Sequence, residues 1–367
     1  MKYALAVSIM ISILSCATKT HDTSGNVELP PLAKPGEGAY VLGEMIQPLT
    51  PQCHASTIVE TPGGFVCAFF AGTHEKNDDV GIRVSRLSET FWSEPVEVAN
   101  GLQDDGQRYP TWNPVLFLPK DGPLMLFYKV GPDPRTWWGM VMTSVDNGQT
   151  WSKPVRIGED KKIGHLIGPV KNKPIQLEDG TIICPSSTET MVGDDVIWKV
   201  HFEITRDMGK TWEVVGPIND GVAFDAIQPS ILRYGNGKLQ VLCRTRQDAI
   251  AESWSDDNGK TWSPMQATML PNPNAGTDAV TLKDGRQLLA YNHTTNEGEE
   301  PKDRNMLNLA ISNDGKTWKP VMTLENVPNE SGYSYPAIIQ AEDGMVHVTY
   351  TFNREAVKHV VIDVSKL

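Results

Sequence analysis

The sequence predicts an all-β fold, a six-bladed β-propeller, because two independent motifs repeat along the chain. The first is a turn phrase of the form Ser/Thr-x-Asp-x-Gly-x-Thr-Trp, complete at 144–151, 205–212 and 255–262. A shortened copy lies at 312–318 and a degenerate one at 85–92. The tryptophans that end these phrases are 59, 61, 50 and 56 residues apart. Such repetition indicates a repeated architecture rather than five catalytic centres.

The second motif is a hairpin with a polar start, an apolar run, a Gly-containing turn and another apolar run. It occurs six times, at 54–70, 112–128, 172–187, 227–243, 277–292 and 334–350. Units of about 55 residues hold four short strands each, the size of one propeller blade. The last unit is one strand short, so we expect residues 38–47 to supply that strand. The propeller should then occupy residues 36–367 as one domain.

The turn phrase itself has a structural explanation. Its Asp can accept hydrogen bonds from the amides of the turn, and its Gly can take a positive φ. Its Trp can pack the hairpin against the blade. We therefore expect Asp146, Asp207 and Asp257 to lie on outer turns, far from the axis, and to stabilise the fold without acting in catalysis.

The bulk composition excludes some classes of partner. The chain has 367 residues, 40% of them hydrophobic and 21% charged, which is ordinary for a globular protein. Lys and Arg number 33 against 45 Asp and Glu, giving a net charge of −12 with no basic cluster. Nucleic acid is therefore not an expected partner.

The first residues carry targeting information. A positive start is followed by an apolar stretch, 4–14, that is too short to span a bilayer. It ends in Ile-Leu-Ser-Cys, which resembles a bacterial lipobox. We expect residues 1–15 to be a signal peptide, Cys16 to be lipidated, and 16–35 to include a polar tether. The protein would be a monomer at the periplasmic or cell surface, touching the membrane only through its lipid. A plain secretory leader is the alternative.

Four further cysteines, Cys53, Cys67, Cys184 and Cys243, show no metal-ligand spacing. Three of them lie inside apolar runs, where a free cysteine behaves as a small hydrophobic residue. No Cys-x-x-Cys or Cys/His cluster occurs in the sequence. We expect neither a metal nor a cofactor.

The residues just before each inner strand differ from unit to unit, although repeat geometry places them around one end of the axis. A purely structural rim could be Ser, Thr and Gly throughout. This rim instead carries an imidazole, amides, ammonium groups, a carboxylate and a phenol, a mixture that favours a binding site. The candidate ligand-binding residues are His54, Asn113, Lys171, Lys173, Gln228, Asp278 and Tyr335.

The turn phrases resemble the Asp boxes of the sialidase (neuraminidase) superfamily, and the resemblance extends through all six units. It implies arginines that bind a sugar carboxylate, a Tyr nucleophile and an acid/base on a blade-one loop. Segments 332–350, 303–318 and 242–262 resemble those bearing the nucleophile and two arginines. They assign Tyr333 as nucleophile and Arg304 and Arg244 as carboxylate ligands. In the loop 72–82, Glu75 fits the acid/base and Asp79 is the reserve.

Two departures from the sialidase pattern are visible. Where the family has Arg-Ile-Pro, this chain has 54–56, His-Ala-Ser, so the first arginine is missing. Where a Glu that activates the Tyr would stand, 225–228 reads Asp-Ala-Ile-Gln. The phrases W-N-P, K-N-K-P, Q-P-S and Y-S-Y-P are closer to the BNR-repeat, sialidase-like branch. Bacterial members often accompany polysaccharide degradation.

The resulting hypothesis is an exo-acting glycoside hydrolase that removes a terminal sugar from an acidic oligosaccharide or polysaccharide. The cationic groups on an acidic protein favour an anionic ligand. Two alternatives remain: a uronate-directed lyase, with His54 or Tyr333 taking a proton, and a glycan-binding lipoprotein without catalysis. We expect His54, Glu75, Arg244, Arg304 and Tyr333 to face a single site.

Overall fold

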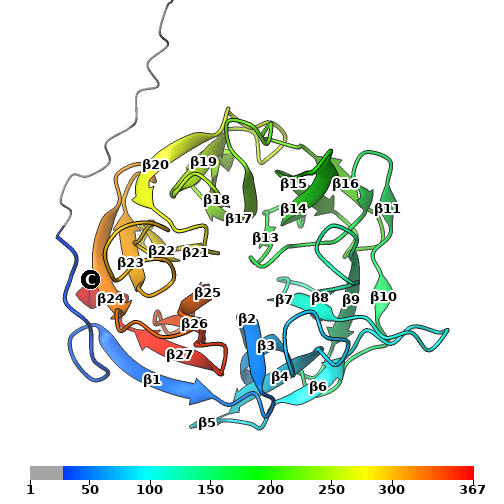
Figure 1. Ribbon diagram of the computed structural model, residues 1–367, viewed down its shortest axis with the longest axis horizontal. Helices are drawn as coiled ribbons and strands as arrows, with labels where there is room; N and C mark the ends of the chain where they lie inside the picture. The colour runs from blue at the N-terminus through cyan, green and yellow to red at the C-terminus, as the bar shows by residue number, and fades with distance from the viewer. Residues whose placement is uncertain (1–27, 89) are drawn as a thin grey trace, which may run out of the picture.

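The computed structural model describes residues 28–88 and 90–367, and these form a ring of six antiparallel sheets around a central axis. Figure 1 views the ring along its axis, with the first strand of each sheet innermost. The six-bladed β-propeller is therefore confirmed. The signal peptide and Cys16 lie outside the described residues. None of the described residues forms a helix long and apolar enough to cross a membrane.

The first three blades lie within residues 52–215, and each runs in the order inner to outer strand. Blade one is β2 (Gln52–Thr61), β3 (Gly64–Gly72), β4 (Gly81–Ser88), β5 (Phe91–Trp92) and β6 (Val96–Ala99). Blade two is β7 (Thr111–Phe117), β8 (Leu124–Val130), β9 (Trp138–Ser144) and β10 (Val155–Arg156). A small hairpin, β11 (Glu159–Asp160) and β12 (Gly164–His165), follows it. Blade three is β13 (Ile175–Gln176), β14 (Ile182–Val192), β15 (Asp195–Thr205) and β16 (Glu213–Val215).

The last three blades complete the ring. Blade four is β17 (Ala226–Arg233), β18 (Leu239–Thr245), β19 (Ala249–Ser255) and β20 (Gln266–Pro271). Blade five is β21 (Asp278–Thr281), β22 (Gln287–Tyr291), β23 (Leu307–Ser312) and β24 (Lys319–Glu325). Blade six is β25 (Tyr333–Gln340), β26 (Val346–Phe352), β27 (Ala356–Ile362) and, as its outer strand, β1 (Tyr40–Ile46).

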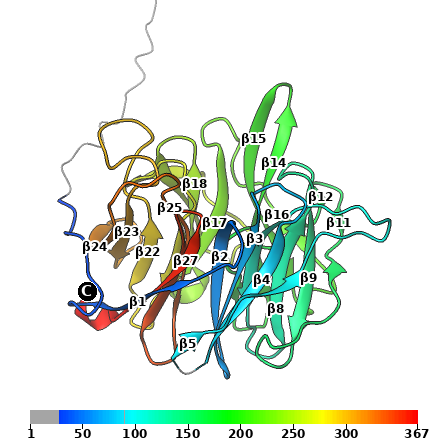
Figure 2. The same ribbon diagram turned by 60° about the horizontal axis from the view of Figure 1, so that its bottom comes forward.

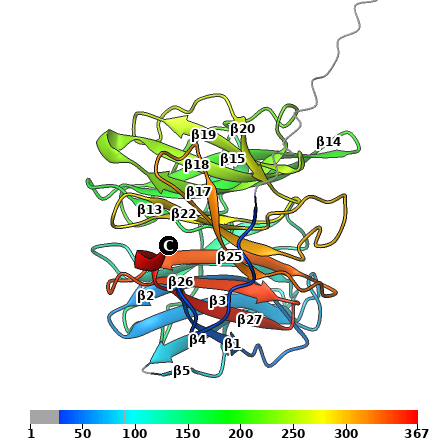
Figure 3. The same cartoon turned by 90° about the vertical axis from the view of Figure 1, so that its left-hand side faces the viewer.

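The N-terminal strand joins the two ends of the chain in one sheet. β1 pairs antiparallel with β27, from Tyr40 opposite Ile362 to Ile46 opposite Val357. This is the strand that the short sixth unit lacks, and blades one and six lie side by side (Figure 3). Upstream of β1, Leu32 forms a parallel bridge with Thr323 of blade five. The described end of the expected tether therefore contacts the propeller.

Hydrophobic cores lie between neighbouring blades, because each sheet buries both faces against the next. One cluster joins blades one and two through Phe70, Ile82, Leu126 and Tyr128. Comparable clusters join blades three with four, four with five and five with six. The four cysteines of the propeller are free and buried, as the apolar runs around three of them predict.

The Asp boxes form identical outer turns in four blades. Asp257 accepts hydrogen bonds from the amides of Lys260 (3.0 Å) and Thr261 (2.9 Å) and from the Thr261 hydroxyl (2.6 Å). Asp146, Asp207 and Asp314 make the equivalent contacts. Each turn follows the third strand of a blade. Strand alternation therefore places it on the face opposite the starts of the inner strands.

Four inner strands carry the same bulge near their start. In blades one, two, four and six the register with the second strand shifts at this point. The bulged residues have positive φ: Ala55 (56°), Asn113 (39°), Gln228 (56°) and Tyr335 (54°). A bulge redirects the side chains beside it. Four of the six blades therefore present an altered backbone to the same end of the axis.

Candidate functional site

The candidate site lies on the face where the inner strands start, and the loops after the second strands reach this same face. Figure 2 shows the long β14–β15 hairpin projecting beyond the ring. Its turn follows a second strand, so it belongs to this face. Side chains from blades one, four, five and six meet here.

Tyr335 is the centre of the arrangement. Its hydroxyl accepts a hydrogen bond from the Gln228 amide (3.1 Å) and one from the Arg244 guanidinium (3.0 Å). Arg244 also donates to the Gln228 side-chain oxygen at 3.3 Å. Gln228 and Tyr335 both lie at bulges, and their side chains meet across the axis from blades four and six. Gln228 occupies the segment in which the sialidase pattern has a Glu.

Asn274 holds two arginines at once. Its side-chain oxygen accepts from Arg244 Nε at 2.6 Å, and its backbone carbonyl accepts from Arg304 at 3.3 Å. The Arg304 guanidinium lies 5.9 Å from the centre of the Tyr335 ring. Residue 332 must be a glycine for its backbone to pack this closely against Arg304, because a Cβ on Gly332 would lie 2.7 Å from the Cβ of Arg304. We call Arg244, Arg304 and Tyr335 the arginine cluster.

His54 lies against the arginine cluster from blade one. Its ring centre is 4.2 Å from that of Tyr335, and its Nδ1 is 2.9 Å from the Thr351 hydroxyl. Burial, and then the nearby cations Arg354 and Arg304, hold the pKa of His54 well below its usual range. The imidazole is therefore neutral at physiological pH. Within residues 28–88 and 90–367 its Nε2 forms no hydrogen bond.

The two carboxylates of the blade-one loop have different partners. Glu75 forms an ion pair with Arg354 at 2.6 Å. Asp79 accepts hydrogen bonds from the amide and the hydroxyl of Thr73, both at 2.9 Å, and so stabilises its own exposed loop. Arg354 belongs to the turn between β26 and β27. The structure thus brings Glu75 to the site through Arg354, and it holds Asp79 within the loop.

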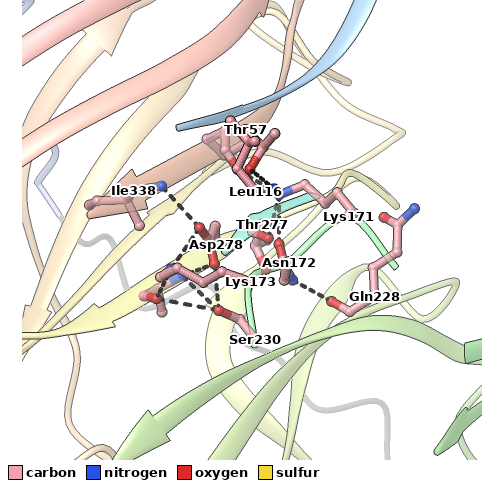
Figure 4. Close-up of polar contacts among 12 residues, drawn as sticks. Thr57, Leu116, Lys171, Asn172, Lys173, Gln228, Ser230, Thr277, Asp278 and Ile338 are labelled. Atoms are coloured by element: carbon pink, nitrogen blue, oxygen red, sulfur yellow. Dashed lines mark hydrogen bonds and ion pairs between the residues drawn. The ribbon is translucent and has the colours of Figure 1, made fainter. Parts of the chain in front are cut away.

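Lys171, Lys173 and Asp278 join blades across the axis, where the sequence predicted ligand contacts (Figure 4). Lys171 is buried and donates to the side chain of Asn172 (2.9 Å) and to the carbonyls of Thr277 (2.8 Å) and Pro336 (2.5 Å). Burial lowers its pKa to about 7. All its donors have protein acceptors.

Asp278 binds Lys173 at 2.9 Å and also accepts from the Ser230 hydroxyl and the Ile338 amide. The Ala279 amide donates to it as well, at 3.0 Å, so this carboxylate has four partners and is 2% exposed. The polar groups of Lys171, Lys173 and Asp278 thus contact other blades, and the binding of a ligand by these three residues stays a prediction. Asn113 occupies its predicted place at the bulge of β7 and is buried there.

The structure contradicts the prediction that the Tyr333 side chain faces the site. Its side chain is 2% exposed and packs in the core between blades five and six. Its hydroxyl donates to the carbonyl of Val327 at 2.6 Å. Side chains alternate along a strand, and the bulge at Tyr335 then turns that second tyrosine toward the arginines. The motif was located correctly, but the tyrosine that faces the cluster is two residues further on.

A partly buried carboxylate that the sequence analysis missed is Glu189, near the end of β14. It accepts a hydrogen bond from Trp198 Nε1 at 3.1 Å, and the Arg244 guanidinium lies 5.2 Å from the Trp198 ring centre. Burial raises the pKa of Glu189 above its ordinary value, although Arg244 opposes that shift. Glu189 also lines a cavity of about 70 Å³ beside Trp137 and His165.

Three residues of the site thus escaped the sequence analysis: Asn274, Glu189 and Arg354. Asn274 has a positive φ of 53° within a Pro-Asn-Pro-Asn-Ala-Gly run, a turn signal that could have marked it. Arg354 lies in a two-residue turn after Asn353, both with positive φ. No local pattern marks Glu189. Across the part of the chain that the structure describes, no group of three His, Cys, Asp or Glu residues could hold a metal ion.

The fold and the repeated turns define the class, a sialidase-like propeller with Asp boxes. Residues 63–348 match the BNR repeat-like domain family, and the chain belongs to that family. A sialidase of Bacteroides fragilis is 26% identical over 235 residues, covering 57% of this chain and 41% of that protein. The chain thus spans about two fifths of that relative's length.

Solved structures share the fold at low identity. A protein of unknown function from Dyadobacter fermentans superposes with a TM-score of 0.73 at 18% identity, covering 88% of this chain and 98% of its own. A Hadza microbial sialidase gives 0.74 at 18% identity, covering 89% and 69%. The NanB sialidase of Streptococcus pneumoniae gives 0.68 at 13% identity, covering 92% and 72%.

Proposed function

We propose that the protein is an exo-acting glycoside hydrolase that releases a terminal acidic sugar from a glycan or polysaccharide. The observation that carries this proposal is where the guanidiniums of Arg244 and Arg304 lie and which groups surround them. Both guanidiniums converge on Tyr335, and within the described residues neither lies within 4.0 Å of a carboxylate. Arg244 is 8% exposed, and buried charges require a partner. An anionic group of the ligand supplies that partner, and a guanidinium matches a carboxylate in shape.

Hydrolysis requires a nucleophile at the anomeric carbon and a proton for the leaving oxygen. In this proposal Tyr335 is the nucleophile. Gln228 cannot take its proton, so His54, neutral and adjacent, accepts it. Glu189 donates a proton to the leaving oxygen, because its raised pKa keeps the acid form present at higher pH. Water then attacks the anomeric carbon and breaks its bond to the Tyr335 oxygen. Glu189 takes the proton of that water, and His54 returns its proton to the departing phenolate.

A uronate-directed lyase is the second candidate, and one observation favours it. The Gln228 amide stands where a sialidase carries the Glu that activates the nucleophile. In a lyase, His54 and Tyr335 instead remove the proton beside the uronate carboxylate and transfer one to the leaving oxygen. Arg244 and Arg304 would then stabilise the charge that develops on the carboxylate.

The deciding experiment is a product analysis. The purified protein is incubated with sialylated oligosaccharides, uronate-containing polysaccharides, sulfated glycans and neutral galactosides as controls, next to an Arg244→Met variant. We expect release of a single acidic monosaccharide by the wild type alone. An unsaturated uronate with ultraviolet absorbance would establish the lyase instead. Equal release from neutral galactosides, or binding without any product, would overturn the hydrolase proposal.

We also propose that the protein is a lipoprotein anchored at Cys16, serving a polysaccharide-degradation system. The lipobox-like Ile-Leu-Ser-Cys sequence supports the anchor. Mass spectrometry of the N-terminal peptide from expressing bacteria tests it, with Cys16→Ser as the control. An unmodified Cys16, or cleavage at another position, would contradict the anchor and leave the proposed enzyme activity standing.

A further inference from the structure

Arg354 is a cation that no motif in the sequence assigns to the site. It occupies the turn between β26 and β27, where Asn353 (φ 49°) and Arg354 (φ 57°) both adopt left-handed backbone conformations. The backbone carbonyl of Arg354 accepts a hydrogen bond from the amide of Cys53 at 2.8 Å. This bond fixes the turn against the start of β2, the residue beside His54.

Arg354 lies beside the place where the site lacks an arginine of the sialidase pattern. The first arginine of the sialidase pattern is replaced by His54. Among the cations around His54, Arg354 exerts the largest electrostatic influence, ahead of Arg304 and Arg244. Arg354 also acts on Arg304 through space. All three guanidiniums therefore act on His54 and lower its pKa.

We propose that Arg354 is a ligand-binding residue, the third cation of the arginine cluster, and that Glu75 positions it through their ion pair. The inference rests on the proposed function for its ligand class, an acidic sugar. The replacement comes from a different blade: the cation lost at the start of β2 is supplied by the last hairpin of blade six.

Glu75 has the geometry of a positioning residue. Its carboxylate holds Arg354 at 2.6 Å, and the two side chains are 26% and 22% exposed. An arginine side chain loses considerable rotamer freedom when it binds an anion, and a fixed partner reduces that cost in advance. Both residues line the same small crevice with Phe70 and Val80. Glu75 thus serves binding through Arg354 rather than proton transfer.

The test measures ligand affinity in matched variants. Wild type, Arg354→Met, Arg354→Lys and Glu75→Gln are titrated calorimetrically with N-acetylneuraminate, galacturonate and, as the neutral control, galactose. Arg206→Met is the control variant, because Arg206 also forms an ion pair, with Glu213, on an exposed hairpin. Thermal unfolding of each variant separates loss of affinity from loss of fold.

We expect Arg354→Met to bind the acidic sugar about 10-fold or more weakly, the loss typical of a charged hydrogen bond. Arg354→Lys should recover part of the affinity, since it keeps the charge without the planar fork. Glu75→Gln should lose less than Arg354→Met, and Arg206→Met should lose nothing. If Arg354→Met does not fold, the Lys variant and Glu75→Gln still decide the question.

The inference is overturned if the Arg354 and Glu75 variants bind the acidic sugar as tightly as the wild type and lose only stability. The ion pair between Arg354 and Glu75 would then be a structural contact. Wild-type hydrolysis would then leave the proposed function intact. Conversely, affinity that depends on Arg354 without any hydrolysis supports the inference and refutes the hydrolase. Failure of the folded wild type to bind either acid would overturn both.

Discussion

The outer turns and the inner strand starts of this propeller come from the same repeat and have opposite character. In four blades the outer turns preserve one set of contacts, with an Asp bonded to the next amides and a Thr hydroxyl. At the inner strand starts, each blade presents a different side chain, such as His54, Gln228 and Tyr335. The repeated contacts of the outer turns stabilise the fold, whereas the differing residues at the inner strand starts are the candidate binding groups.

The inner strand starts divide further into two kinds. Blades one, four and six carry bulges at their inner strand starts, where His54, Gln228 and Tyr335 lie on the same side as Arg244 and Arg304. Blades three and five instead contribute Lys171, Lys173 and Asp278, whose polar groups join these two blades across the axis. Charge alone therefore does not identify a ligand contact. What matters is whether the protein already uses every hydrogen-bond donor or acceptor of the charged group.

The largest effect should separate two tyrosines that lie two residues apart. Tyr335→Phe removes the hydroxyl that Gln228 and Arg244 contact, and should lower turnover about 100-fold or more if Tyr335 reacts covalently. Tyr333→Phe removes a bond to the Val327 carbonyl, and should cost about 1 kcal/mol of stability with turnover retained. Rate measurements and urea unfolding of both variants check this. Normal turnover in Tyr335→Phe would remove it from catalysis.

The next effect concerns Lys171. Lys171→Met leaves three buried oxygens without a donor and should lower the free energy of unfolding by about 2–4 kcal/mol. Lys161→Met, an exposed control, should change it little. Affinity for the acidic ligand should persist in the folded fraction. A variant that is stable yet no longer binds ligand would return Lys171 to the binding site.

A third effect is pH-dependent and tests the ring closure. Glu44 of β1 bonds His359 at 2.8 Å, and His359 bonds His347 at 2.9 Å. Burial and His359 lower the pKa of His347 to about 4. The folded state thus binds this proton less readily than the unfolded chain, whose histidine titrates near 6.5. Stability is fully present above pH about 6.5 and falls toward pH about 4, by up to about 3 kcal/mol.

Urea unfolding at pH about 7.5 and about 4.5 measures this loss, and His347→Gln, which cannot titrate, should lose less over the same interval. A variant with the same acid loss as the wild type would assign the sensitivity to other groups.

The smallest effect should come from a single Asp box. Asp257→Ala removes the acceptor of the Lys260 and Thr261 amides and should lower stability by about 1 kcal/mol. Its exposed neighbour provides the control, Asp256→Ala, which should be neutral. Turnover should be unchanged in both. A loss of turnover without loss of stability would contradict the structural role of these turns.

The sequence alone predicted the architecture well because a repeat multiplies weak signals. One turn phrase means little, but five phrases and six hairpins at a common period specify the blade size and the blade count. The short sixth unit pointed to the strand now seen as β1 beside β27. In the site, the repeat located His54, and the resemblance to the sialidase superfamily located Arg244 and Arg304.

Only the tertiary structure decided how each polar group is used, because that depends on neighbours from other blades. Tyr333 and Tyr335 are indistinguishable in sequence, and a bulge of one residue determines which faces the arginines. Lys171 looks like a ligand contact until the oxygens of blades five and six surround it. Arg354 lies near His54 because ring closure brings the β26–β27 turn beside the start of β2. These contacts join segments up to about 300 residues apart, beyond the reach of any local pattern.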